Sequence, residues 1–353
     1  MEMRDSEMKK NDISETFIKK AQALKKLGLS RRVFDKCESQ GMFKSYAIDK
    51  NNFYKIADLD SFMATASYSK LVNGIVDSRN KLNDLTGKEW LPETKSYFFQ
   101  KGLGKDHPDA QIERLHPAPF SFQDIEKLIL FFTKAEMVVL DPFGGVGSTA
   151  KACELTNRSC ISIELSHKYH ELAIKRLEKE VAEGASAKHQ FVNGDSCEIL
   201  PTLLDESVDM IVTSPPYWGI LNKQDQKVKA DRVANGLDTK YSNDKKDLGN
   251  VESYTNFLDI LVNKIFLQCA RVLKKDKYML IIVSDFRDKG DFISFHSDLI
   301  QRLNNVDVPN GGKLGLAGTK ILIQNHKSLH PYGYPFAYVE NIHHQYVLIF
   351  RKK

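Results

Sequence analysis

Short apolar runs alternate with amphipathic stretches from about His116 to the end of the chain. The first five runs are separated by segments whose apolar residues recur at helical spacing, among them 148–155, 167–184 and 254–273. Strands that alternate with helices in this way predict βαβ units around a parallel sheet. The predicted strands are MVVL (137–140), CISI (160–163), FVNG (191–194), VDMIVTS (208–214), YMLIIVSD (278–285), TKILIQ (319–324) and HQYVLIFR (344–351).

The last two predicted strands have no long helix between them. They are expected to pair as an antiparallel hairpin at one edge of the sheet, since antiparallel neighbours need no crossover helix. The pattern therefore predicts a three-layer α/β/α domain with a mostly parallel, seven-stranded sheet and an antiparallel C-terminal hairpin.

The first part of the chain has a different pattern. Residues from about Phe17 to Met63 are helical in pattern and locally basic, with a short break at LGLS (27–30), whereas residues 64–110 show no clear period. We expect a small helical domain over 1–70, a connecting segment over 71–110 and the α/β domain over 111–353.

Composition adds few constraints. The 353 residues carry a formal net charge of +5, which permits a polyanionic partner without requiring one. The five cysteines show no C-x-x-C pair, which predicts reduced thiols in a cytoplasmic protein and no metal site. No apolar run approaches the roughly 20 residues that span a bilayer, and the first residues are too polar for a signal peptide, so no membrane segment is expected.

The first chemical signal is a glycine-rich turn, VVLDPFGGVGST (138–149), between a predicted strand and a predicted helix. Glycines allow a ligand to approach the backbone closely, and a helix N-terminus offers free N–H groups. The next two strands end at Glu164 and Asp195, so with Asp141 three acidic residues meet at one edge of the sheet. An acidic side chain about 20 residues after the turn can accept hydrogen bonds from the ribose hydroxyls of a nucleoside. This arrangement predicts nucleoside binding.

The identity of the nucleoside depends on Asp141. A dinucleotide would place a pyrophosphate over the helix N-terminus, whereas an acidic residue there suits an ammonium group. We therefore expect S-adenosylmethionine (SAM), with the amino-acid end of SAM near Asp141.

The second signal is TSPPYWG (213–219), which follows directly on the buried strand VDMIV. Two consecutive prolines cannot continue a central strand, so the chain must turn rigidly at the sheet edge where a ligand would bind. The two segments together resemble the SAM-dependent DNA amino-methyltransferases, which methylate cytosine N4 or adenine N6. The family's cofactor motif F-x-G-x-G is matched by Phe143, Gly145 and Gly147, and its catalytic motif (D/N/S)-P-P-(Y/F/W) by Ser214, Pro215, Pro216 and Tyr217.

The resemblance implies a Rossmann-like methyltransferase fold and several site residues. HPAPF (116–120) looks like the family segment that helps enclose the methionine part of SAM, which implicates His116, Ala118 and Phe120, and the cofactor turn ends at Thr149. Serine at the first catalytic position is commoner in cytosine-N4 enzymes, so cytosine is favoured over adenine. The implied partners are double-stranded DNA, whose target base is flipped out, and a cognate restriction endonuclease in those members that have one.

In the implied mechanism, the Ser214 side chain and the Pro215 carbonyl accept hydrogen bonds from the two protons of the exocyclic amine. This localises the nitrogen lone pair, and the positioned amine then attacks the methyl group directly. Tyr217 would stack on the flipped base, and Trp218 would extend that platform. Cysteine and metal are not required.

Three segments are candidates for target recognition. Residues 219–250 form a long lysine-rich loop, and residues 326–345 concentrate aromatic and histidine residues; packing and solvated-loop interpretations stay open for both. The N-terminal region resembles the helix–turn–helix of excisionase-like and MerR-like proteins, with Ser30 as the cap of a recognition helix. In that resemblance the DNA-facing residues are Arg31, Arg32 and Lys36.

Two other functional classes stay open. One is a methyltransferase that acts on RNA or on a protein amide, where P-P-Y corners also serve. The other is a DNA-binding regulator that binds SAM without transferring its methyl group.

Overall fold

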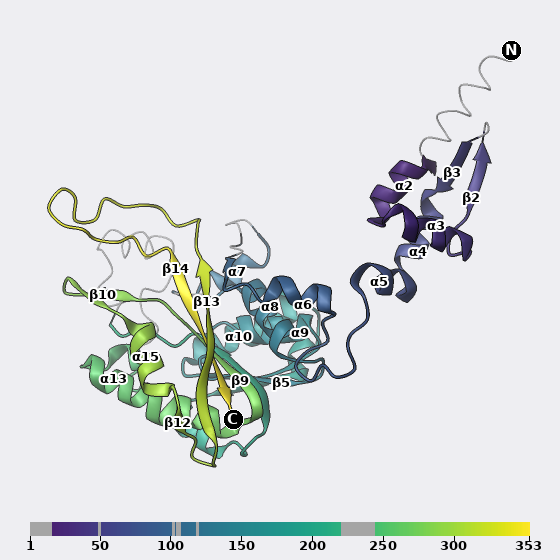
Figure 1. Ribbon diagram of the computed structural model, residues 1–353. Coiled ribbons are helices and arrows are strands. Elements are labelled where there is room, and N and C mark those ends of the chain that lie inside the picture. Colours follow the sequence, from purple (N-terminus) through teal and green to yellow (C-terminus); the bar gives the residue numbers. More distant parts are fainter. Residues whose placement is uncertain (1–15, 49–50, 101–102, 104–106, 118–119, 220–243) are drawn as a thin grey trace. The chain divides into compact units, whose positions relative to one another are not determined.

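The computed structural model describes residues 16–48, 51–100, 103, 107–117, 120–219 and 244–353 (Figure 1). These residues form two compact units. The first comprises the described residues up to Asn80 together with Leu85–Pro92, and the second comprises Lys81–Asp84 and Glu93–Lys353.

The first unit has a small aromatic core of its own. Two helices, α2 (Lys20–Leu27) and α3 (Arg31–Ser39), are joined by a short turn in which Gly28 has a φ of +61°. The Ser30 hydroxyl accepts a hydrogen bond from the Val33 N–H and so caps α3, as its position in the sequence suggests. The remaining elements are β1 (Phe17–Lys19), β2 (Ser45–Ile48), β3 (Asn51–Lys55), α4 (Ile56–Met63), α5 (Ala66–Asn73) and most of α6 (Gly87–Glu93).

One large sheet organises the second unit. The strand order is β12-β13-β14-β9-β8-β5-β6-β7, and β4 pairs with β13 beside this path. The five strands nearest the glycine turn run parallel, while β13 and β14 pair antiparallel with each other. The strands are β4 (Tyr97–Phe99), β5 (Val138–Asp141), β6 (Ser159–Glu164), β7 (Gln190–Asn193), β8 (Val208–Thr213), β9 (Leu273–Val283), β12 (Val306–Asp307), β13 (Lys313–Ile323) and β14 (His344–Lys352).

The mostly parallel sheet and the antiparallel C-terminal hairpin are confirmed, and all seven predicted strands are present. The predicted strand number was wrong, because the sheet has nine strands. The two additional strands are short: β4 lies in the segment without a clear period, and β12 has only two residues.

Helices cover both faces of the sheet (Figure 1). On one face lie α8 (Phe122–Phe132), α9 (Ser148–Leu155) and α10 (His167–Glu180). On the other lie α13 (Tyr254–Ile260), the π-helical turn η5 (Leu261–Phe266), α14 (Leu267–Val272) and α15 (Phe295–Leu303). Short elements complete the unit: α7 (Ala110–Glu113), η1 (Ala185–Lys188), α11 (Ser196–Ile199), η2 (Leu200–Thr202), η4 (Leu248–Asn250) and the hairpin β10 (Phe286–Asp288)–β11 (Asp291–Ile293).

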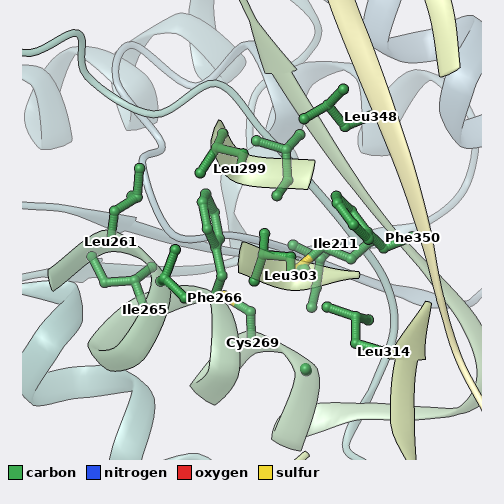
Figure 2. Packing of buried hydrophobic residues seen from close by; sticks show 14 of the residues in the cluster. Ile211, Leu261, Ile265, Phe266, Cys269, Leu299, Leu303, Leu314, Leu348 and Phe350 are labelled. Atoms are coloured by element: carbon green, nitrogen blue, oxygen red, sulfur yellow. The ribbon is translucent and has the colours of Figure 1, made fainter. Parts of the chain in front are cut away.

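The larger part of the core lies between the sheet and the second helical layer (Figure 2). Ile211 of β8 and Phe350 of β14 belong to this core. They lie in one cluster with Phe266, Cys269 and Leu303 of the covering helices. Alternate residues of the central strands pack against the opposite layer, so β8 is buried along its whole length. Because both faces of these strands are buried, the parallel strands appear in the sequence as nearly continuous apolar runs.

None of the helices in the described part of the chain is long and apolar enough to cross a bilayer.

Candidate active site

A cavity of about 750 Å³ opens at the carboxyl ends of β5, β6, β7 and β8. Nine of the residues predicted from the sequence line it: His116, Phe143, Gly145, Glu164, Asp195, Ser214, Pro215, Pro216 and Tyr217. The glycine turn and the proline corner, which are some 70 residues apart in the chain, therefore form walls of the same cavity.

The glycine turn needs its glycines for two different reasons. Gly145 has a φ of +51° and lies against the imidazole of His116, so its backbone faces the cavity directly. Gly147 has a φ of +77° and precedes α9, where a Cβ would stand 2.9 Å from the Cβ of Ala173. Gly147 thus permits close packing of α9 on α10 and does not line the cavity.

Glu164 is held in the cavity wall by two backbone donors. Its carboxylate accepts hydrogen bonds from the Gly145 N–H at 2.8 Å and from the Ser166 N–H at 2.7 Å. An ionised carboxylate has about four lone-pair sites, so each oxygen keeps room for a further donor. Burial outweighs the two hydrogen bonds and raises the pKa of Glu164 to about 7.

Asp141 lies behind the cavity wall instead of on its surface. Its buried carboxylate accepts hydrogen bonds from the Thr149 hydroxyl at 2.5 Å, the Thr213 hydroxyl at 2.6 Å and the Phe143 N–H at 3.0 Å. Burial raises the pKa of this carboxyl above its usual value despite these three donors. Asp141 and Thr149 therefore join the glycine turn, the first turn of α9 and the end of β8; direct contact of Asp141 with an ammonium group stays a prediction.

The proline corner begins directly where β8 ends at Thr213. Ser214 faces the cavity, and its hydroxyl has no hydrogen-bond partner within the described part of the chain. The Tyr217 hydroxyl accepts hydrogen bonds from the Ser284 N–H at 3.0 Å and from the Gln345 amide at 3.2 Å. These contacts fix the tyrosine ring at the cavity wall, and burial raises the pKa of its hydroxyl.

The remaining predicted site residues lie elsewhere. Phe120 and Trp218 are outside the cavity lining; the Trp218 indole donates to the Val251 carbonyl at 2.7 Å and packs on Tyr254. Ala118 lies outside the described residues, as does the lysine-rich segment 220–243. The other three, all exposed on α3 in the first unit, are Arg31, Arg32 and Lys36.

Several polar residues of the cavity were missed. Ser166 is the N-cap residue of α10 at the end of β6, a position that the sequence marks but that we did not connect with Glu164. Tyr169 lies in the predicted helix 167–184, which showed no chemical motif; it is buried, and its ring packs edge-on against the His116 ring with the ring centroids 4.7 Å apart. Lys246 and Asp247 lie within the predicted loop 219–250, where no periodic pattern distinguishes a lining residue from a solvated one.

The lining carries the kinds of group that a nucleoside would need. Ile163, Leu165 and Ile265 provide apolar wall for a base, Glu164 offers acceptors for vicinal hydroxyls, and Asp195 is a further acceptor on the adjacent strand end. Among the described residues, no group of three or more His, Cys, Asp or Glu side chains is arranged to hold a metal ion.

Comparison with known proteins gives one family match. The model of a family described as DNA methylase, of the N6/N4 class, matches residues 11–175 and 208–353. The orphan methyltransferase M.BamHII of Bacillus amyloliquefaciens is 26% identical over 154 residues, which cover 38% of this chain and 58% of that protein. The type II methyltransferase M.ScaI of Streptomyces caespitosus is 36% identical over 138 residues, which cover 39% of this chain and 43% of that protein. The chain thus spans about half the length of these relatives.

A structural neighbour is a putative DNA modification methylase of Thermus thermophilus, TTHA0409, solved in complex with SAM. It is 25% identical, covers 45% of this chain and 53% of its own, and has a TM-score of 0.30. A TM-score this low adds nothing to the family match.

Proposed function

The chain belongs to the N6/N4 DNA methylase family, and from this premise we propose that it transfers a methyl group from SAM to the exocyclic amine of a base in double-stranded DNA. Cytosine N4 is the favoured acceptor and adenine N6 the alternative. One observation carries the proposal: the Ser214–Tyr217 corner and the Gly145–Glu164 wall line the same cavity.

When bound, SAM supplies an electrophilic methyl carbon on a sulfonium, and transfer forms the N–CH₃ bond as the S–CH₃ bond breaks, leaving S-adenosylhomocysteine and a proton. Glu164 and Asp195 would hold the nucleoside through its hydroxyls and its base, and His116 would close over the glycine turn. The role of Asp141 is to keep that turn against the end of β8, so that cofactor wall and catalytic corner stay in register.

The exocyclic amine that receives the methyl group would be oriented by the Ser214 hydroxyl and by the Pro215 carbonyl. The serine hydroxyl has no hydrogen-bond partner among the described residues, so it can accept one from the substrate. Two consecutive prolines restrict the backbone that carries the Pro215 carbonyl. Tyr217 would offer its ring to a flipped base, since both partners of its hydroxyl hold that ring in one orientation. Preorganised acceptors of this kind lower the barrier without a nucleophilic side chain.

Serine at position 214 supports cytosine N4, in keeping with the commoner residue in the enzymes that this motif resembles. Either amine presents two protons to the same acceptors, so the geometry alone gives little preference. Nucleoside analysis of DNA from cells that express the protein identifies the product directly. We expect to find N4-methylcytosine. If N6-methyladenine is found instead, adenine N6 is the acceptor and the preference for cytosine is wrong.

Separate roles for the two walls can be tested with labelled SAM and duplex DNA. In Tyr217→Ala the loss of a stacking surface should slow transfer by roughly ten- to a hundredfold, with SAM affinity unchanged. Tyr217→Phe keeps the ring and should retain most of the activity, and Tyr97→Ala, on the exposed strand β4, is the control. A protein that binds both SAM and DNA but never transfers label would be a regulator, and transfer to RNA or to a protein amide alone would exclude the DNA enzyme.

A further inference from the structure

The connection between β13 and β14 exposes an unusual set of large side chains. Residues 324–343, which we call the aromatic arm, extend from the sheet as a long loop (Figure 1). Phe336 is 93% exposed, Tyr338 89% and Tyr334 81%. Isolated apolar residues on a surface are ordinary, but a contiguous exposed set marks an interaction surface.

The arm is ordered by its own hydrogen bonds. The Asn341 side chain donates to the His330 carbonyl at 2.8 Å and accepts from the His330 N–H at 2.9 Å, so the two sides of the loop are tied together. At the tip, the Gly333 carbonyl accepts from the N–H groups of Phe336 and Ala337 at 2.7 and 2.8 Å. Gly333 has a φ of +73°, and a Cβ there would meet the Ala337 carbonyl oxygen at 2.3 Å. The aromatic rings are therefore presented by a built turn.

The base of the arm is part of the catalytic wall. Gln345, the second residue of β14, donates to the Tyr217 hydroxyl, and the His344 carbonyl accepts from the Ser284 hydroxyl at 3.3 Å. Higher on the arm, the Glu340 carbonyl accepts from Arg287 of β10 at 3.3 Å. The arm thus rises from the sheet edge where the proline corner opens into the cavity.

We propose that the aromatic arm contacts duplex DNA beside the target base, with Tyr334, Phe336 and Tyr338 packing against exposed base faces. The proposal rests on the proposed function, because a base held at Tyr217 stays attached to a duplex that must pass the sheet edge from which the arm rises. Extrusion of one base leaves its stacking neighbours uncovered, and apolar or aromatic side chains are the groups that proteins insert at such steps.

The charge of the arm agrees with stacking as its mode of contact. Between residues 324 and 343 the only Lys, Arg, Asp or Glu residues are Lys327 and Glu340, which cancel. An arm of this composition neither repels the phosphate backbone nor releases many counterions on binding. Its contribution to affinity should therefore depend little on salt, unlike that of a lysine- or arginine-rich surface.

The test compares the full-length chain with the triple variant Tyr334→Ala/Phe336→Ala/Tyr338→Ala, using sheared duplex DNA from cells without methyltransferases. We expect the Kd and the KM for this DNA to rise at least about tenfold, with SAM affinity, melting temperature and the slope of log Kd against log salt unchanged. Leu204→Ala removes an exposed apolar group far from the arm in the chain and should leave DNA binding intact. Replacement of all three by Trp should preserve it.

Wild-type affinity for duplex DNA in the triple variant would overturn the proposal. If that variant also converts a wild-type dimer to a monomer in gel filtration, the arm is a contact between copies of the chain. DNA binding is measured separately from methyl transfer, so the proposed function and the role of the arm can be refuted by different results. A wild-type chain that binds DNA but transfers no methyl group refutes the proposed function, whereas an active triple variant with normal KM refutes only the role of the arm.

Discussion

Glu164 has a buried carboxyl group that is predicted to contact the cofactor, so we expect cofactor binding to depend on pH. Its pKa in the fold is about 7, against 4.5 for an exposed glutamate, because burial penalises the charged form. A raised pKa means that the folded state binds the proton more tightly than the unfolded chain does. The contribution of this group to stability is therefore fully present below about pH 4.5 and is lost as the pH rises through 7.

Cofactor binding should respond in the opposite direction. If ribose hydroxyls donate to the ionised Glu164, SAM affinity increases as the pH rises, and a group with a pKa near 7 predicts a roughly tenfold gain between pH 6 and pH 8. Isothermal titration of the purified chain with SAM measures this directly. Glu164→Gln should bind more weakly and lose the pH dependence; a wild-type affinity that is flat over this range would contradict the role given to the carboxylate.

Asp141 shows what a sequence pattern can and cannot predict for a single residue. Its position at the strand end and its proximity to the glycine turn were predictable, because an apolar run followed by D-P-F-G-G fixes where β5 stops. The direction of its side chain was not. Thr149 and Thr213 lie 8 and 72 residues away in the chain, and only the folded sheet brings both hydroxyls onto the carboxylate.

At the level of elements, the segment that carries His116 is fastened to the helices by a buried charge network. Arg176 of α10 is completely buried and donates to Glu113 at 2.7 Å, to Glu180 at 2.9 Å and to the Ser148 hydroxyl at 3.0 Å. Lys151 of α9 also donates to Glu180, at 2.7 Å. The network ties α7, α9 and α10 together next to the glycine turn.

Removing the guanidinium should be costly, because it leaves buried carboxylates without enough partners. Arg176→Met is expected to lower the free energy of unfolding by about 3–5 kcal/mol, measured by urea denaturation. Lys175→Met, one residue away on the exposed face of the same helix, should change it little. Adding Glu113→Gln to Arg176→Met should recover part of the loss. If Arg176→Met is as stable as Lys175→Met, the network contributes nothing to the stability of the fold.

Elements with strong periodicity were predictable and irregular ones were not. The strands at 160–163 and 208–214 and the helix at 148–155 appear within a residue of their predicted limits, since each is a buried run with clear ends. Strand β4 was not foreseen, because its three residues gain their pairing only when β13 lies alongside. Cavity residues such as Lys246 follow the same rule, as their placement depends on tertiary contacts and not on any local repeat.

For the whole molecule, the division into two units raises the question of what the first unit binds. The basic residues predicted to face DNA, Arg31, Arg32 and Lys36, are exposed on α3 and make no ion pair within the described part of the chain, whereas Lys20 and Lys26 of α2 are paired with acidic residues. Exposed cations that make no ion pair and share one helix are suited to phosphate contacts.

The double charge reversal Arg31→Glu/Arg32→Glu should weaken binding of the full-length chain to duplex DNA while SAM affinity stays the same. If each arginine contacts one phosphate, the slope of log Kd against log salt should fall in magnitude by about 2, because each contact contributes roughly 0.9. Fluorescence anisotropy over a salt series measures both quantities.

The control pair Lys25→Glu/Lys70→Glu makes the same change in net charge on other helices of this unit and should reduce the slope less. Equal effects of the two pairs would indicate general electrostatic attraction in place of a recognition helix, and no effect of either would favour a protein-docking role. Together with the salt-independent loss expected for the aromatic arm, this experiment separates an electrostatic contact made by one unit from a stacking contact made by the other.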